Sequence, residues 1–272
     1  MVSQLPKKIT SVHNPEIKRV RLLQQKSRAR KKHGLFVIEG MRELKRALHA
    51  GYELEQIVML EGITMPPDLH PVNAEETISL CEVSTTVFEK ISFRSSTEKA
   101  IFLAKSKSHT LERLTNLPNN PSILVVEAPE KPGNMGALFR TAVAANMDAV
   151  IIVDPKTDVY HPNCIRASLG CVFEIPTATA SAKAAHDFLK QYDITILAAA
   201  LHAKSIPYHH FHYPNSCALV MGAEDTGVSP FWLEHATALL EIPMAGSIDS
   251  LNLSVSAGIL MYELRKNQNR LP

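Results

Sequence analysis

Short apolar runs alternate with stretches of helical periodicity in the second half of the chain. The runs that predict strands are Ile123–Glu127, Ala149–Val153, Val172–Ile175, Ile194–Ala199, Ala218–Met221 and Leu239–Ile242. The stretches that predict helices are Met135–Asn146, Ala182–Tyr192 and Leu253–Lys266. Continuous apolar strands separated by helices are typical of a parallel sheet covered on both faces. We therefore expect an α/β domain over residues 122–272.

The first part of the chain follows a less regular α/β pattern. A helix is predicted from the cap and first turn at Asn14-Pro15 to about Lys31, and a second helix over Met41–Ala50, which Gly51 ends. Strands are predicted at Leu35–Ile38, Ile57–Leu60 and Ala100–Ala104, and a loop is predicted at Thr64–Pro71. The secondary structure of Val83–Ile91 is ambiguous from its sequence. This pattern indicates a small domain over residues 1–105 and a polar linker, rich in Pro and Asn, over residues 106–121.

Charge separates the two predicted domains more clearly than composition does. Residues 1–121 carry 19 Lys or Arg against 13 Asp or Glu, whereas residues 122–272 carry 10 against 14. Ten of the basic residues lie between Lys7 and Lys32, where Glu16 alone opposes them. A clustered basic face is typical of proteins that bind a phosphate backbone, although a solvated helix has the same composition.

Several classes of protein are not supported. The chain has no apolar run long enough to span a bilayer and its start lacks the apolar core of a secretory signal, so we expect a cytoplasmic protein. Neither a P-loop nor G-x-G-x-x-G is present. We expect no metal site. The candidates are His209, His210 and His212, interpreted as a solvated loop, and Cys81, Cys164, Cys171 and Cys217, interpreted as separate reduced thiols.

Ligands of a parallel sheet bind at the carboxyl ends of its strands, and three glycine-containing segments follow predicted strands. The first is Lys131–Thr141, with the sequence KPGNMGALFRT. We expect Asn134 to cap the following helix, on which Arg140 lies six residues later. Taken alone, this segment also fits an ordinary loop with an exposed arginine.

The other two segments add carboxylate, hydroxyl and amide groups. In Met221–Ser229, Glu224 lies between two glycines, and acidic residues there favour a cationic or neutral ligand over a polyphosphate. In Ile242–Glu263, Ser250 and Asn252 stand at the start of a helix, where each is also a candidate cap.

Together these segments resemble the three signature motifs of the SpoU/TrmH-type RNA 2′-O-ribose methyltransferases of the SPOUT superfamily, in order and at typical spacing. His161–Pro176 resembles the N-x-x-R-x-S-x-G segment of that family, and GLFVIEGMRELKRAL with the basic helix resembles its L30e-like RNA-binding domain. Two positions depart from the pattern. The first motif reads APEKPGN in place of an acidic D-P-x-N run, and Val228 stands where Leu is common.

The resemblance implies an L30e-like substrate-binding domain, a catalytic domain with a deep C-terminal trefoil knot, and a homodimer. It implies that S-adenosylmethionine donates a methyl group to a ribose 2′-hydroxyl of RNA. The implied cofactor positions are Gly222, Ile242 and Leu251, with Met221, Met244 and Ala199 beside them. The implied catalytic residues are Asn134, Arg140, Glu224, Ser250 and Asn252. The candidate RNA contacts are Arg28, Arg30, Lys31, Lys32, Arg166 and Ser168.

Some alternatives stay open at this point. The extra basic domain favours 23S-type rRNA as the substrate over tRNA, and a non-catalytic RNA-binding protein of ribosome assembly is a third interpretation. One role implied for Arg140 is that of the base. A guanidinium stays protonated in proteins, so stabilisation of a developing alkoxide or a grip on the adjacent phosphate suits it better.

Overall fold

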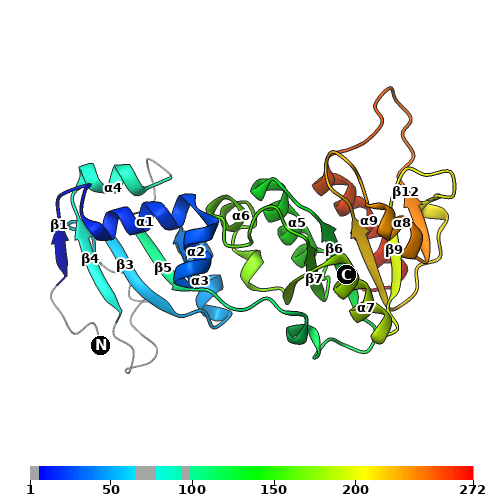
Figure 1. Ribbon diagram of the computed structural model, residues 1–272, viewed down its shortest axis with the longest axis horizontal. Helices are drawn as coiled ribbons and strands as arrows, with labels where there is room; N and C mark the ends of the chain where they lie inside the picture. Colours follow the sequence, from blue (N-terminus) through cyan, green and yellow to red (C-terminus); the bar gives the residue numbers. More distant parts are fainter. Residues whose placement is uncertain (1–5, 65–77, 94–98, 272) are drawn as a thin grey trace. The chain divides into compact units, whose positions relative to one another are not determined.

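The computed structural model describes residues 6–64, 78–93 and 99–271, and the chain forms two compact units (Figure 1). The first unit comprises residues 1–107 together with Tyr160–Arg166, and the second comprises Ser108–Val159 and residues 167–272. The loop predicted at Thr64–Pro71 lies, from Met65 onward, outside the described residues. Within the described ranges, no helix has the length and apolar character needed to cross a bilayer.

A mixed sheet forms the centre of the first unit. Its described elements in chain order are β1 (Lys7–Ile9), α1 (Pro15–Gln25), α2 (Ser27–His33), β2 (Leu35–Glu39), α3 (Met41–His49), β3 (Leu54–Leu60), β4 (Ser79–Val83), α4 (Thr85–Ile91) and β5 (Ala100–Lys105). The strand order among them is β1-β4-β3-β5-β2, with β5 antiparallel to both of its neighbours. The expected small α/β domain is confirmed, and the ambiguous stretch at Val83–Ile91 proves to be the end of a strand followed by a helix.

The basic helix is divided in two, which corrects the single helix predicted from Asn14 to Lys31. Asn14 caps α1 as expected, because its side chain accepts a hydrogen bond from the backbone N–H of Glu16 at 2.9 Å. Lys26 then adopts an extended conformation and separates α1 from α2. The Arg30 guanidinium turns back and donates to the carbonyl oxygens of Leu23, at 2.7 Å, and Gln24, at 3.2 Å. Arg30 thereby satisfies carbonyl groups that the end of α1 leaves without helical partners.

The second unit is built on a parallel sheet. Its elements are η2 (Leu111–Leu114), β6 (Ser122–Glu127), α5 (Pro132–Ala144), β7 (Ala149–Val153), η3 (Cys171–Phe173), β8 (Thr177–Ala180), α7 (Ala182–Gln191), β9 (Thr195–Ala199), β10 (Ile206–Pro207), η4 (Tyr208–His210), β11 (Cys217–Met221), α8 (Pro230–His235), β12 (Ala238–Glu241) and α9 (Leu253–Asn267). Helix α6 (Pro162–Ala167) belongs to the first unit up to Arg166. The seven strands found in the described residues follow the order β10-β12-β9-β11-β6-β7-β8, and all their pairings are parallel. The predicted parallel sheet is confirmed.

Helices cover both faces of this sheet. Alternate residues of each strand point to opposite faces, so each strand contributes apolar side chains to both cores. On one face, Ile123 and Val125 of β6 share a core with Leu189 of α7 and Trp232 of α8. The opposite face is covered by α5 and α9, which pack against each other; Leu138 and Leu260 are buried there. Strands buried on both faces read as the continuous apolar runs that predicted them.

One predicted strand is wrong. Val172–Ile175 is apolar, but Cys171–Phe173 forms a 3₁₀ turn and the strand follows at Thr177–Ala180. Leu169 and Gly170 both have positive φ angles, of 55° and 84°, and this left-handed backbone turns the chain just before the apolar run. The buried side chains of Val172 and Phe173 therefore fill the core from a turn, so their apolar character is not a strand signal.

A buried arginine anchors the end of α9 at the amino end of the sheet. Arg265 is 1% exposed and donates to the Ser122 hydroxyl at 3.0 Å and to the Gln268 side-chain oxygen at 3.3 Å. Its Nη1 lies 3.5 Å from a carboxylate oxygen of Asp148, which Arg270 also approaches at 3.5 Å. Burial lowers the pKa of Arg265 from its ordinary value. The network ties α9 to the start of β6.

Replacing Arg265 is expected to destabilise the second unit. Loss of one partner of a buried ion pair typically lowers the free energy of unfolding by about 3–5 kcal/mol. We expect the loss in Arg265→Met to lie toward the lower end of this range, because Asp148 still has Arg270 as an ion-pair partner. Denaturant unfolding followed by the fluorescence of Trp232, the single tryptophan, reports on this unit. The matched control is Lys266→Met on the neighbouring, exposed position of α9, which we expect to change stability by no more than about 0.5 kcal/mol. Equal stability of the two variants would contradict the role assigned to Arg265.

Candidate functional site

A cleft of about 410 Å³ opens in the second unit where β9, β11 and β12 end. Its walls come from the loops that follow these strands and from the start of α9, as expected for the carboxyl edge of a parallel sheet. All six positions predicted for the cofactor line it: Ala199, Met221, Gly222, Ile242, Met244 and Leu251. Glu224 and Ser250 line it as well.

The cleft is apolar and acidic. Four carboxylate residues line it, namely Glu224, Asp225, Glu241 and Asp249. None of the described residues that form its walls is a Lys, Arg or His. Aliphatic side chains such as Leu240 and Leu260 supply the remaining surface. This lining suits a ligand that combines an apolar body with positive charge, and it disfavours a polyphosphate.

The loop between β11 and α8 closes on itself at Gly222. A Cβ atom built on Gly222 would lie 2.0 Å from the carbonyl carbon of Gly227 and 2.1 Å from the nitrogen of Val228. Ala223 and Gly227 exchange two backbone hydrogen bonds, of 2.9 and 3.0 Å, and Gly227 has a φ of 69°. Only glycine at position 222 permits this approach, because any side chain there would overlap the opposite strand of the loop.

A buried carboxylate fixes the far end of the same loop. Glu127, at the carboxyl end of β6, is 8% exposed and accepts a hydrogen bond from the backbone N–H of Ser229 at 2.8 Å. The sequence motifs did not single out Glu127. Its signal was present, because a charged residue ends an otherwise apolar strand that leads to the ligand edge.

Glu224 joins this loop to the start of α5. One of its carboxylate oxygens accepts a hydrogen bond from the Asn134 amide at 2.6 Å, and the other bonds to the Lys131 ammonium. The bond from Lys131, with the charge of the carboxylate, raises the pKa of that lysine. The expected cap at Asn134 is wrong: α5 begins at Pro132, so Asn134 lies in the first turn and directs its amide to Glu224. Lys131 was also not predicted.

The remaining predicted catalytic residues are exposed. Arg140 lies on α5 and makes no hydrogen bond or ion pair with any residue that the structure describes. Ser250 is exposed at the cleft. Asn252 caps α9: its side-chain oxygen accepts from the backbone N–H of Ser254 at 2.9 Å and from the Ser254 hydroxyl at 2.6 Å. The structure thus gives Asn252 a defined structural role, and its catalytic role stays a prediction.

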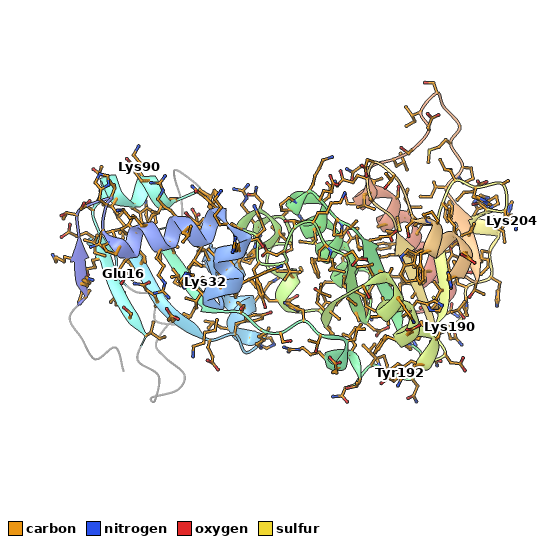
Figure 2. All side chains as sticks on the ribbon, in the orientation of Figure 1. Glu16, Lys32, Lys90, Lys190, Tyr192 and Lys204 are labelled. Atoms are coloured by element: carbon orange, nitrogen blue, oxygen red, sulfur yellow. The ribbon has the colours of Figure 1, made fainter. Side chains whose placement is uncertain are left out.

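Three of the four basic residues predicted on the N-terminal helix are exposed on α2. These are Arg28, Lys31 and Lys32, and Figure 2 labels Lys32. Arg30 is only 2% exposed, since its guanidinium binds the end of α1. Burial removes Arg30 from the surface that RNA could contact, so we do not include it in the proposed interface.

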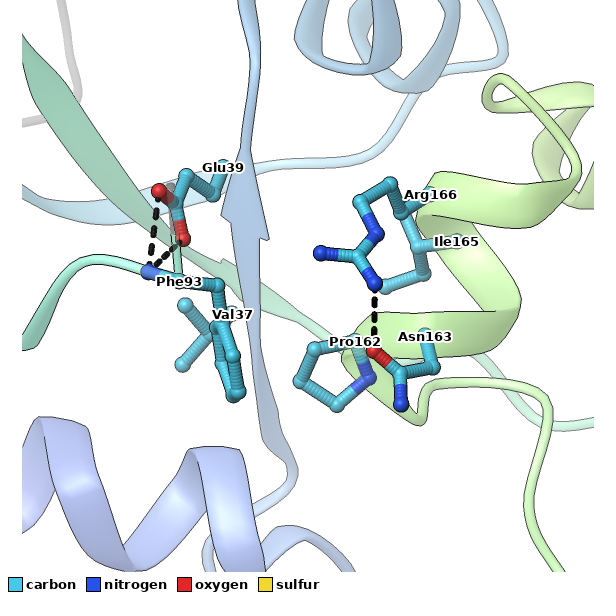
Figure 3. A pocket seen from close by; sticks show the side chains of 7 residues that line it. All are labelled: Val37, Glu39, Phe93, Pro162, Asn163, Ile165 and Arg166. Atoms are coloured by element: carbon cyan, nitrogen blue, oxygen red, sulfur yellow. Dashed lines mark hydrogen bonds between the residues drawn. The ribbon is translucent and has the colours of Figure 1, made fainter. Parts of the chain in front are cut away.

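The predicted pair Arg166 and Ser168 is divided in the same way. Arg166 is half-buried in the first unit, where its Nη2 donates to the Asn163 side chain at 3.2 Å beside a small hollow (Figure 3). Across that hollow, the Glu39 carboxylate accepts from the backbone N–H of Phe93 at 2.8 Å. Ser168 is fully buried, and its hydroxyl accepts from the backbone N–H of Gly170 at 3.2 Å. Ser168 therefore shapes the turn and is withdrawn as an RNA contact.

The histidine and cysteine side chains were the candidates for a metal site. In the described part of the chain, no three His, Cys, Asp or Glu side chains gather closely enough to hold a metal ion. His209, His210 and His212 are exposed around η4. The four cysteines are buried and form no disulfide with one another, and burial raises the pKa of Cys217 to about 12.

Fold and site together define an α/β protein that binds a small ligand at the carboxyl edge of a parallel sheet. The profile of the SpoU rRNA methylase family matches residues 121–262, and that of the MRM3-like substrate binding domain matches residues 14–101. The 23S rRNA (guanosine(2553)-2′-O)-methyltransferase RlmP of Bacillus subtilis is 30% identical over 259 residues, which cover 95% of this chain and 99% of that protein. The chain belongs to the SpoU rRNA methylase family, and the family predicted from the motifs is confirmed.

Other relatives and solved structures agree with this family. The 23S rRNA (guanosine-2′-O-)-methyltransferase RlmB of Neisseria meningitidis is 34% identical over 61% of this chain and 66% of that protein. A crystal structure of an RNA 2′-O ribose methyltransferase is 40% identical, with a TM-score of 0.79, and covers 97% of this chain and 100% of its own. That of the AdoMet-bound rRNA methyltransferase from Sinorhizobium meliloti is 28% identical, with a TM-score of 0.85, over 96% of this chain and 97% of its own.

Substitution of Gly222 tests how the loop is held. In Gly222→Ala, the added Cβ overlaps backbone atoms that no rotamer change can move, so the loop must open. We expect the amides of Ala223 and Gly227 to exchange hydrogen at least about tenfold faster. The matched control is Gly133→Ala, because a Cβ there meets no atom within 4 Å. Unchanged exchange in Gly222→Ala would contradict the close approach.

Proposed function

We propose that this protein transfers a methyl group from S-adenosylmethionine to the ribose 2′-hydroxyl of a guanosine in 23S rRNA. The acidic cleft without lysine or arginine carries the proposal, because it suits a donor with a positive sulfonium centre. Full-length similarity to RlmP supports the reaction and the substrate, and an AdoMet-bound rRNA methyltransferase of the same fold supports the donor.

The cleft fits this cofactor in size and chemistry. About 410 Å³ lies within the usual range of roughly 300–1,000 Å³ for small-molecule sites. Ile242 and Leu251 would contact its apolar parts, and the close backbone of Gly222 would let its edge approach the loop. When bound, the cofactor supplies an activated methyl group on a positively charged sulfur. The carboxylates of Glu224 and Asp225 would favour that charge electrostatically.

The polar residues of α5 and of the loop that leads into α9 would act on the RNA. Arg140 is exposed and keeps its donors available, and a guanidinium is protonated at any working pH, so it would stabilise the developing alkoxide or hold the adjacent phosphate. Asn134 would keep the Glu224 carboxylate in place. Ser250 and the Asn252 cap would order the loop that leads into α9 near the ribose.

RNA would be held by the basic first unit. We propose that residues 1–105 bind RNA, that residues 106–121 connect the domains, and that residues 122–272 carry out methyl transfer. The exposed Arg28, Lys31 and Lys32, with Arg166, would contact phosphates. A cytoplasmic homodimer with a deep trefoil knot near the C-terminus completes the proposal by family resemblance.

Methyl transfer from radiolabelled S-adenosylmethionine to in vitro transcribed 23S rRNA and to transcribed tRNA tests the function. We expect label in 23S rRNA, and nuclease digestion should release it as 2′-O-methylguanosine. Label in tRNA alone would show that the substrate is tRNA and not 23S rRNA. Binding of 23S rRNA without any methyl transfer would point to a non-catalytic assembly protein.

Loss of Arg140 is expected to abolish transfer while cofactor affinity stays the same. Removing one donor that stabilises transition-state charge typically lowers kcat by roughly two to three orders of magnitude. Arg140→Lys should also fail if two-point donation matters, because a lysine offers only a point charge. Single-turnover rates and calorimetric titration of the cofactor measure the two effects. Near-normal turnover in Arg140→Ala would refute the assigned role.

The basic surface of α2 is expected to contribute to RNA binding in a salt-dependent way. Replacing Arg28, Lys31 and Lys32 with Ala should reduce the slope of log affinity against log salt by about 0.7–0.9 for each phosphate that the variant no longer neutralises. Arg30 is left intact because it supports α1. The control replaces the exposed Lys90, Lys183 and Lys190, which removes the same charge elsewhere. Filter binding at several salt concentrations measures the two slopes. Equal slopes for the two variants would show that α2 is not part of the RNA interface.

A further inference from the structure

Lys131 is a cation beside a cleft whose described walls contain none. It directly precedes α5, and its side chain is 70% exposed, whereas the Glu224 side chain that it bonds is 16% exposed. The carboxylate therefore lies on the inner side and the ammonium on the solvent side of the pair. Lys131 stands where the first motif departs from the acidic residue common in the family.

The negative charge around Lys131 makes its positive charge important for RNA binding. The cleft presents four carboxylates, and residues 122–272 carry an excess of acidic residues. RNA carries one negative charge at each phosphate, so this unit repels its own substrate unless cations stand at the mouth of the cleft. Lys131 lies next to Glu224, and Lys156 pairs with Glu130 beside it.

The pair can also open without leaving a buried charge unsatisfied. Asn134 donates to the other oxygen of Glu224 at 2.6 Å, so the carboxylate keeps a partner when Lys131 turns away. An exposed ion pair contributes little to stability, and a lysine is a point charge on a flexible stem. Both properties suit a side chain that exchanges one anionic partner for another.

We propose that Lys131 is a substrate-positioning residue whose ammonium leaves Glu224 to bind the phosphodiester next to the ribose that is methylated. The inference rests on the proposed function, since it assigns the RNA substrate of that function to a named contact. Binding of this phosphate would fix the ribose at the mouth of the cleft, where a small displacement costs rate.

The test compares Lys131→Ala and Lys131→Arg in the full chain. We expect Lys131→Ala to raise the KM for transcribed 23S rRNA roughly tenfold at low salt, and to reduce the salt slope of RNA affinity by about 1. Lys131→Arg retains the cation and should restore both values. Affinity for S-adenosylmethionine, measured by calorimetry, should be the same in all three proteins.

The matched control is Lys183→Ala, which removes an exposed lysine from an ion pair with Asp187 in the same unit. Equal RNA affinity and equal salt slope in Lys131→Ala and Lys183→Ala would overturn the proposal. So would weaker cofactor binding in Lys131→Ala, because the lysine would then only support the Glu224 loop. If the wild-type protein transfers no methyl group, the proposed function fails, while the salt slopes still decide whether Lys131 binds phosphate.

Discussion

The close approach of two backbone segments at Gly222 determines the form of the cleft. Because position 222 has no side chain, the chain can turn back and pair Ala223 with Gly227, and Glu127 then holds the amide of Ser229. This short, fixed loop carries Glu224 to the start of α5, where Asn134 and Lys131 meet it. Backbone contacts therefore position the loop that carries Glu224, and the Asn134 amide then holds the carboxylate itself.

The proposed function requires one protein to bind a cation and a polyanion close to each other. In the second unit, carboxylates line the cleft, whereas Lys131 and Arg140 lie outside its lining and are exposed to solvent. A concave acidic surface raises the local concentration of a cationic ligand, and exposed cations act on RNA through salt-dependent attraction. The first unit supplies most of the basic residues, so the second unit can keep an acidic cleft.

Apolar continuity explains which parts of the fold the sequence predicts. The strand at Ala149–Val153 is found with the bounds that were predicted, because a strand buried on both faces must be apolar throughout. Val172 and Phe173 are equally apolar and yet form a turn, since the positive φ angles just before them depend on packing that no local pattern records. Lys26 ends a helix although it is a good helix former, because Arg30 gives the chain another way to satisfy the carbonyl groups at that end.

Polar residues mark the limit of the same reasoning. Arg30 and Lys31 are neighbours in one basic run, but Arg30 is buried because its guanidinium turns back to the end of α1, whereas Lys31 is exposed. The motifs located Glu224 and Asn134 separately, whereas their contact spans 90 residues of sequence and turns an expected helix cap into a partner of a carboxylate. Lys131 was visible only as a missing acid in the first motif. Its meaning comes from the carboxylate that folding places opposite it, so a departure from a motif becomes informative once its three-dimensional partner is known.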